Sequence, residues 1–125
     1  MWNEPNREMA ALLHPANGNR SIDEVIVKSG SGVLAAGTVM ATFTTAGADK
    51  GKLVPYADSG SAGAGTATHV LGAAVDATST DVPAKAIARD AEIIDGELVF
   101  GASVDNDTKR AKAIADLALQ GLITR

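Results

Sequence analysis

The sequence of 125 residues contains no cysteine, which excludes a disulfide framework and a thiolate metal site. Aromatic residues are scarce, at 3% of the chain, whereas alanine is abundant and glycine contributes 13 residues. The core must therefore be built from small and β-branched side chains. Because small side chains bury little apolar surface each, we expect association with further copies to add to the buried area. A chain of this length has room for one core of ordinary size.

Clustered positive charge and long apolar runs are also lacking. The chain has 15 acidic and 11 basic residues, a net charge of -4, and its basic residues are scattered. Nucleic-acid binding requires grouped lysine and arginine side chains, so nucleic acid is not an expected partner. No stretch approaches the roughly 20 apolar residues of a membrane span, and residues 1–20 lack the apolar run of a signal peptide. A membrane partner is therefore not expected either.

Residues 1–20 differ in composition from the rest of the chain. They contain Pro5 and Pro15 in polar surroundings, and their apolar run at residues 9–13 is too short for a free helix. We interpret this segment as a flexible N-terminal arm that precedes a single domain over residues 21–125. For Trp2 the sequence leaves two interpretations open: an exposed tail residue, or an anchor that becomes ordered on a partner.

The segment from residue 21 to residue 100 has the pattern of short β-strands separated by turns. Strands are predicted at 22–28, over the run 33–45, and at 52–56, 69–75, 82–87 and 91–94. Gly37 predicts a turn or bulge inside the second of these runs. The stretch 58–68, rich in glycine and alanine, is predicted to be a surface loop. Asp95 and Gly96 predict a hairpin turn, with residues 98–100 as the returning strand.

A helical period follows residue 104. Residues 105–108 supply N-cap candidates and early acidic side chains. Apolar residues then recur at helical spacing. The predicted buried face of this helix consists of Ala111, Ile114, Ala115 and Ala118, with Leu117 flanking them. Gly121 is placed to end the helix, and residues 122–124 predict a last short strand. The expected fold is therefore a mainly β (α+β) domain of short strands with one C-terminal amphipathic helix.

No arrangement typical of a catalytic, cofactor or metal site emerges. The two histidines, His14 and His69, lack ligand spacing, and no serine occupies a G-x-S-x-G sequence. The glycine-rich stretch 60–69 lacks the G-K-[ST] of a phosphate-binding loop, and no helix follows it. The carboxylates around the predicted hairpin are interpreted as a solvated turn: Glu92, Asp95 and Glu97. We therefore expect that the protein is not an enzyme and that it binds no cofactor and no metal.

Several groups of residues nevertheless occur in a characteristic order. They are GVLAAGTVMATFT followed by GKLVPYADSG, then HVLGAAVDATSTD, AIARDAEI and the closing DNDTKRAKAIADLALQGLITR. In this order they resemble the lambda-type head decoration (cementing) proteins of tailed bacteriophages, from Asp23 to Arg125. The resemblance implies a compact, mainly β domain of the β-clip type with one helix, and no catalytic site or cofactor. It also implies an arm that becomes ordered on the phage shell.

The function that this resemblance implies is structural. A homotrimer would bind the major capsid protein at three-fold and quasi-three-fold sites and stabilise the expanded capsid against internal DNA pressure. The expected location is the outer surface of the capsid head, after synthesis in the host bacterial cytoplasm. The arm has no stretch that matches the family, so the expected capsid-binding residues are taken from its composition: Trp2, Asn3, Glu4, Arg7, Met9, Leu12 and Leu13. The alternative is a small β binding module, adhesin-like or carbohydrate-binding, displayed on a virion or cell surface.

Overall fold

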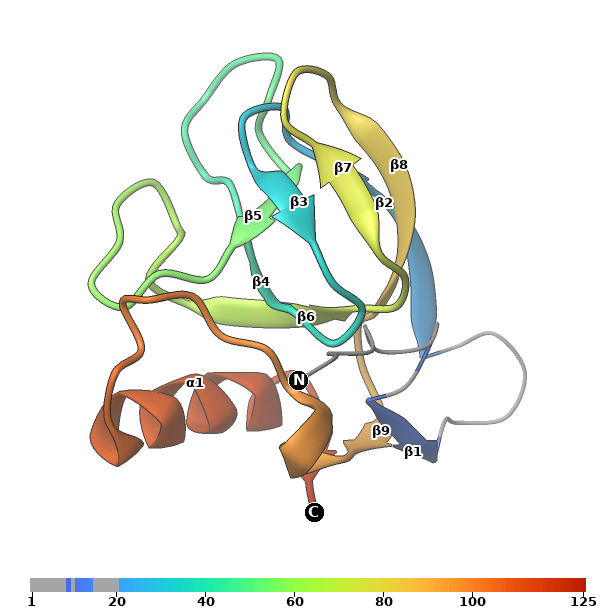
Figure 1. The fold of residues 1–125 in the computed structure, drawn as a ribbon, viewed down its shortest axis with the longest axis vertical. Helices are drawn as coiled ribbons and strands as arrows, with labels where there is room; N and C mark the ends of the chain where they lie inside the picture. The colour runs from blue at the N-terminus through green and yellow to red at the C-terminus, as the bar shows by residue number, and fades with distance from the viewer. Residues whose placement is uncertain (1–8, 10, 15–20) are drawn as a thin grey trace, which may run out of the picture.

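The computed structural model describes residue 9, residues 11–14 and residues 21–125 (Figure 1). These residues form ten short strands, one 3-10 helix and one α-helix. In chain order the elements are β1 (Leu12–His14), β2 (Ile22–Val27), β3 (Gly32–Leu34), β4 (Val39–Thr42), β5 (Leu53–Pro55), β6 (Ala67–Leu71), β7 (Val75–Ala77), β8 (Val82–Ile87), β9 (Ala91–Ile93), η1 (Asp95–Glu97), α1 (Asp107–Ala118) and β10 (Leu122–Thr124). The expected class, mainly β with one helix near the C-terminus, is confirmed.

The centre of the fold is a closed barrel of five strands in the order β2-β5-β4-β6-β8. β2 pairs with β8 in antiparallel register along its whole length, ending with Val27 opposite Val82. Its other edge meets β5 at one pair only, Val27 with Leu53, in parallel orientation. Successive side chains of a strand point to opposite sides, so alternate aliphatic residues fill the barrel. The buried residues of this first core are Val27, Leu34, Met40, Leu53, Leu71, Ala77 and Ala86.

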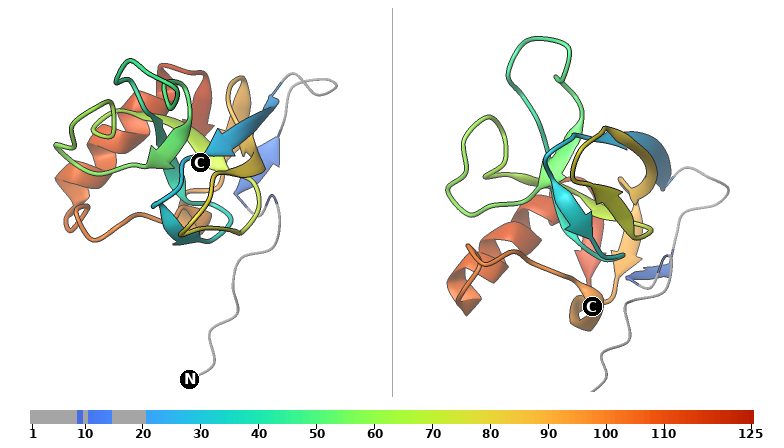
Figure 2. Two further views of the ribbon diagram at one scale, coloured as in Figure 1. Left: turned by 90° about the horizontal axis from the view of Figure 1, so that it is seen from above. Right: turned by 45° about the horizontal axis from the view of Figure 1, so that its top comes forward.

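Three further units flank the barrel (Figures 1 and 2). They are a ribbon of β3 and β7, the helix α1 beneath β6, and a three-stranded sheet in the order β1-β9-β10, named here the terminal sheet. Within the terminal sheet, β9 pairs antiparallel with β1 and parallel with β10. A second core joins the barrel, α1 and the terminal sheet. Its fully buried residues include Val70, Ile87, Ile93, Leu117 and Leu122.

Glycine is required in two places where the chain turns. Gly37 lies between β3 and β4 with a φ of +91°, which confirms the predicted turn. Gly63 also has a φ of +91°, and a Cβ at this position would overlap the carbonyl oxygen of Thr42. The predicted loop over 58–68 is confirmed as far as Thr66, and β6 begins at Ala67.

The helix and the last strand form where the sequence predicts them. The side chain of Asn106 caps α1 by accepting a hydrogen bond from the backbone N–H of Lys109 at 2.9 Å. The helix spans Asp107–Ala118, and Gly121, with a φ of +82°, lies in the turn that follows. β10 then spans Leu122–Thr124.

The predicted buried face of α1 is wrong. Three of its four residues are exposed, namely Ala111, Ala115 and Ala118. The fully buried residues are instead Ala113 and Leu117, and Ile114 packs partly buried beside them. Alanine occurs both in protein cores and on surfaces, so the spacing of alanines is a weak guide to which side of a helix is buried. The larger Leu117 decides the orientation of the helix, because exposing its apolar surface to water would cost more free energy than exposing an alanine.

The hairpin predicted at residues 95–96 is also wrong. The turn is the 3-10 helix η1, and residues 98–100 form no returning strand; the chain continues toward α1. Val99 makes a single parallel bridge with Thr38 of the barrel region. Arg110 of α1 donates to the carbonyl and the carboxylate of Asp95, at 2.8 and 2.7 Å. The helix thus fixes the turn in an arrangement that local sequence does not specify.

Candidate functional site

One charged cluster lies on the barrel wall. Arg89 donates to the Asp23 carboxylate at 2.5 Å, and His69 interacts electrostatically with both. His69 Nδ1 lies 2.8 Å from the Thr68 hydroxyl, which is 2.9 Å from the Thr42 hydroxyl. Burial lowers the pKa of His69, and the nearby Asp23 carboxylate opposes this effect. The hydrogen bond from Arg89 lowers the pKa of the Asp23 carboxyl. These contacts join β2, β6 and the end of β8.

Two of the acidic residues around the predicted hairpin, Asp95 and Glu92, are engaged in ion pairs. Asp95 pairs with Arg110 at 2.7 Å, and Glu92 pairs with Arg125 at 3.2 Å. Within the described ranges, no three histidine, aspartate or glutamate side chains are arranged to hold a metal ion. No helix in the same ranges is long and apolar enough to cross a membrane.

The terminal sheet is the candidate functional site because it combines part of the predicted capsid-binding segment with the C-terminal strand. In the backbone register, His14 and Ile123 flank the same residue of β9, Glu92. Two further backbone hydrogen bonds, each of 2.8 Å, fix the sheet: Ile94 N–H donates to the Ala11 carbonyl, and Arg125 N–H donates to the Ile93 carbonyl.

The inner side of the terminal sheet belongs to the second core. Ala11 is 1% exposed, and Leu12 packs partly buried against the same core. Met9 donates its backbone N–H to the Gly72 carbonyl at 2.5 Å, and its side chain fills the space that a Cβ on Gly72 would need. The strand predicted over 69–75 is interrupted at this glycine, between β6 and β7. Met9, Ala11 and Leu12 are therefore packed against the domain, and Leu12–His14 pairs with β9, unlike the arm expected for these residues.

The outer side of the terminal sheet presents two aliphatic side chains to solvent. Leu13 is 42% exposed and Ile123 is 41% exposed. Ile123 lies between the buried Leu122 and the partly buried Thr124, as the alternation of a strand requires. The exposed Leu13 lies between Leu12 and His14, where the pairing of β1 with β9 shifts register. The ion pair of Glu92 and Arg125 accompanies them. We name these four residues, Leu13, Glu92, Ile123 and Arg125, the outer patch.

The outer patch has the composition of a protein-docking surface. Exposed aliphatic side chains gain free energy when a partner removes them from water, and a flanking ion pair contributes to orientation. Sequence analysis identified Leu13 but missed Ile123 and its ion-paired neighbours. The alternation of Leu122–Thr124 was the available signal, because a strand with one buried side must present its middle residue on the other side.

The other residues expected to bind a capsid divide into two groups. Trp2, Asn3, Glu4 and Arg7 lie outside the described residues. Met9 and Leu12 pack against the core of their own chain, as described above. Leu13 is therefore the expected residue that the structure places on an exposed surface.

Two comparisons with known proteins address the identity of the chain. The search of curated proteins returned no match. The family model described as bacteriophage lambda head decoration protein D matches residues 1–122. This match begins at residue 1, whereas the motifs that carry the sequence resemblance begin at Asp23, and it ends at the first residue of β10. The chain therefore belongs to the family of bacteriophage lambda head decoration protein D.

Proposed function

We propose that this protein stabilises the expanded head of a phage as a homotrimer on the outer surface of the capsid. The family is a structural one, and its name implies association with the phage capsid. The proposed sites are the three-fold and quasi-three-fold positions, where one trimer would bridge neighbouring molecules of the major capsid protein. The protein would be made in the bacterial cytoplasm and added to the head.

The outer patch is the observation that supports this function in the structure. It is assembled from β1, β9 and β10, so it lies on the side of the domain to which the residues before β1 and the last residue are attached. We propose that this side faces the capsid. Three copies of a modest patch would then act together, because each contact raises the effective concentration of the other two.

Stabilisation in this setting is kinetic. A head under the pressure of packaged DNA fails irreversibly, so the relevant quantity is the rate of rupture rather than an equilibrium constant. A protein that binds the intact expanded lattice more tightly than the transition state of rupture would raise the barrier and lower that rate. This proposed function requires a surface that is complementary to the capsid, and it requires no catalytic group.

The test compares bare heads, heads decorated with the natural chain, and heads incubated with Leu13→Asp or Ile123→Asp. Loss of DNA is measured against temperature and against removal of divalent cations. The natural chain should raise the temperature of DNA loss, with saturation at the number of three-fold-type sites. Each aspartate variant should bind less tightly by about 1 kcal/mol or more. Val99→Asp, which changes an exposed valine away from the outer patch, is the matched control.

The outcomes separate the functions. Equal resistance of bare and decorated heads would contradict a stabilising role. Decoration that is unchanged by both aspartate variants would contradict the outer patch as the capsid-facing surface. A monomer that binds glycans and leaves heads bare would favour the adhesin-like or carbohydrate-binding module instead.

A further inference from the structure

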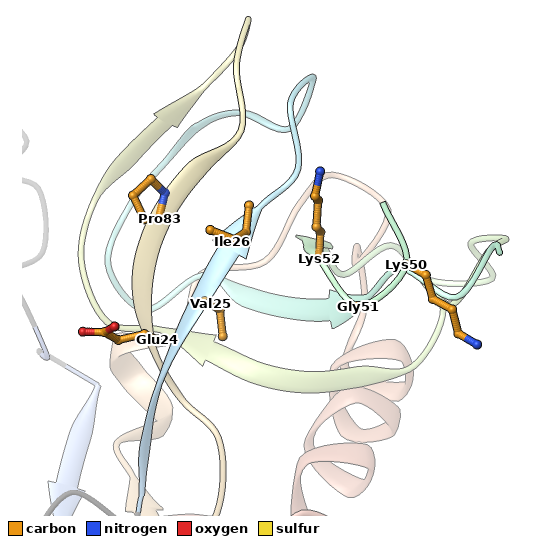
Figure 3. A pocket seen from close by; sticks show the side chains of 7 residues that line it. All are labelled: Glu24, Val25, Ile26, Lys50, Gly51, Lys52 and Pro83. Atoms are coloured by element: carbon orange, nitrogen blue, oxygen red, sulfur yellow. The ribbon is translucent and has the colours of Figure 1, made fainter. Parts of the chain in front are cut away.

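The barrel has an open seam beside β2. One edge of β2 is paired along its length with β8, whereas the other meets β5 only at Val27. In the ranges that the structure describes, residues 22–26 therefore have a strand edge without a strand partner. A hollow of about 600 Å³ opens along this edge (Figure 3). Its lining residues are Glu24, Val25, Ile26, Lys50, Gly51, Lys52 and Pro83.

One wall of the hollow is held rigidly. Lys52 pairs with Asp49 at 2.7 Å and with Asp81 at 2.5 Å. The second oxygen of Asp81 accepts the backbone N–H of Ser29 at 2.8 Å. Three loops are thereby tied together at the rim of the hollow. A site whose walls are already fixed loses less conformational entropy when it is filled.

The hollow combines an apolar wall with a cation. Ile26 is 40% exposed, and Figure 3 shows Ile26 and Pro83 on one side of the hollow and Lys52 on the other. Lys50 lies at the outer rim, with its amine directed away from Ile26. Lys50 makes no ion pair with the described residues. An occupant that fits would thus supply an extended backbone edge, an aliphatic side chain and a carboxylate.

The ribbon of β3 and β7 supplies these three features. β3 pairs with β7 alone among the described strands, so its second edge is also without a strand partner. Val33, in the middle of β3, is 77% exposed. Its cross-strand neighbour is Asp76, which bonds to Thr78 within its own turn and to no basic side chain of the described chain.

We propose that β3 of one copy lies in the hollow beside β2 of the next copy, with Val33 toward Ile26 and Pro83 and Asp76 toward Lys50. This inference rests on the homotrimer of the proposed function and assigns its contact surfaces. The two surfaces are different patches of one chain, so each copy gives its ribbon to one neighbour and receives the ribbon of the other. A head-to-tail contact of this kind closes into a ring of three if each step turns by 120°.

Two physical arguments favour a second copy as the occupant. Pairing of the two strand edges satisfies backbone N–H and C=O groups that otherwise require water, and it covers edges that promote uncontrolled association. The charges are also complementary, because the hollow carries Lys50 and the ribbon carries Asp76. Both halves of the contact are present on the same molecule, so no other partner is needed.

The absence of cysteine permits a direct test. In a chain carrying both Ile26→Cys and Val33→Cys, oxidation should join copies head to tail and give a covalent trimer on a denaturing, non-reducing gel. Each single variant should remain monomeric on that gel because neither residue meets its own equivalent. A chain with Ile26→Cys and Leu119→Cys is the control, since Leu119 is 83% exposed but lies at the end of α1. The oxidation is carried out in solution and on decorated heads.

Charge reversal provides a second readout. Lys50→Glu should weaken self-association at least several-fold in sedimentation experiments, and the pair Lys50→Glu with Asp76→Lys should restore it. Trimers by sedimentation that give no covalent product in either setting would overturn the assigned surfaces and leave the proposed function intact. Protein that is monomeric both in solution and on heads would overturn the trimer itself. A covalent bond within one chain, or products longer than three copies, would overturn the closed ring.

Discussion

Gly63 shows how a single residue controls the loop between β5 and β6. Its φ of +91° is a conformation that L side chains rarely adopt, and its Cα faces the backbone of Thr42. The backbone N–H of Thr44 donates to the Ala62 carbonyl at 2.8 Å, which holds the loop against the end of β4. Glycine is therefore required at this position, because the loop packs its backbone against the backbone of Thr42.

Gly63→Ala should therefore lower the free energy of unfolding by about 2 kcal/mol or more, from left-handed strain and from overlap with Thr42. Gly96→Ala is the matched control, because Gly96 has an ordinary φ and open space around its Cα. That control should be neutral or stabilising by up to about 1 kcal/mol. Urea denaturation measures both variants, and equal effects would contradict the packing argument.

His69 makes stability depend on pH. Burial lowers its pKa below the ordinary value of 6.5, with Asp23 opposing and Arg89 assisting. As the pH falls below 6.5, the unfolded chain binds a proton that the folded chain does not bind. The free energy of unfolding should therefore decrease with falling pH until the pH passes the folded pKa of His69. Asp23, whose pKa is lowered by Arg89, contributes a separate loss below pH 3.8.

His69→Gln should remove the first of these losses and keep the second. The measurement is urea denaturation of both chains at a series of pH values between 7 and the acid range. An unchanged slope below pH 6.5 in the variant would show that a group other than His69 causes the dependence.

At the scale of the element, α1 shows that an amphipathic pattern and a buried face are different properties. The pattern locates the helix correctly, but the helix rests on Ala113 and Leu117 rather than on the predicted alanines. Its partners explain this orientation. Arg110 reaches Asp95, and the Asp116 carboxylate accepts the backbone N–H of Ala67 at 3.2 Å. These tethers fix the rotation of the helix about its axis.

Two leucines at the end of α1 allow this orientation to be tested. Leu117→Ala should lower the free energy of unfolding by about 2–5 kcal/mol, because Leu117 is fully buried in the second core. Leu119→Ala, two residues later, should change it by less than about 0.5 kcal/mol, because Leu119 is 83% exposed. Thermal or urea unfolding measures the loss of stability in each variant. A larger loss for Leu119→Ala than for Leu117→Ala would contradict the observed buried face of the helix.

At the scale of the whole molecule, β1 connects residues distant in sequence. It pairs with β9, and the preceding Ala11 is buried in the core shared with α1. The N-terminal segment therefore has a packed part, and we propose that the residues before Met9 act on the capsid. Truncation at two positions separates these roles.

A chain lacking residues 2–8 should keep its free energy of unfolding, because this stretch is polar apart from Trp2 and Pro5 and has no apolar periodicity. A chain lacking residues 2–14 should lose about 2 kcal/mol or more, through the loss of Ala11, Leu12 and the β1 pairing. The shorter truncation should still bind heads less tightly, and Trp2→Ala alone should cost more than about 1 kcal/mol of binding if Trp2 is an anchor. Undiminished binding by the shorter truncation would contradict the role proposed for these residues.

The sequence alone determined the local features of this protein. Alternation located β2 and β8, helical spacing and the Asn106 cap located α1, and Gly37 located a turn. These features depend on residues within one or two turns of each other, so they are readable without the fold. The order of several weak motifs also identified the family that the comparison over residues 1–122 confirmed.

Only the tertiary structure decided how these elements meet. Leu12–His14 became a strand because β9 offers it an edge 78 positions away, counted from His14 to its partner Glu92, and no local pattern encodes that pairing. Leu13 and Ile123 came to lie in the two strands that flank β9 for the same reason. The exposed side of α1 was decided by the burial of Leu117 in the second core, together with tethers to Asp95 and Ala67. Of the 22 buried hydrophobic residues in the described ranges, nine are alanine, whose small side chain occurs both in cores and at surfaces, so these choices are left to long-range contacts.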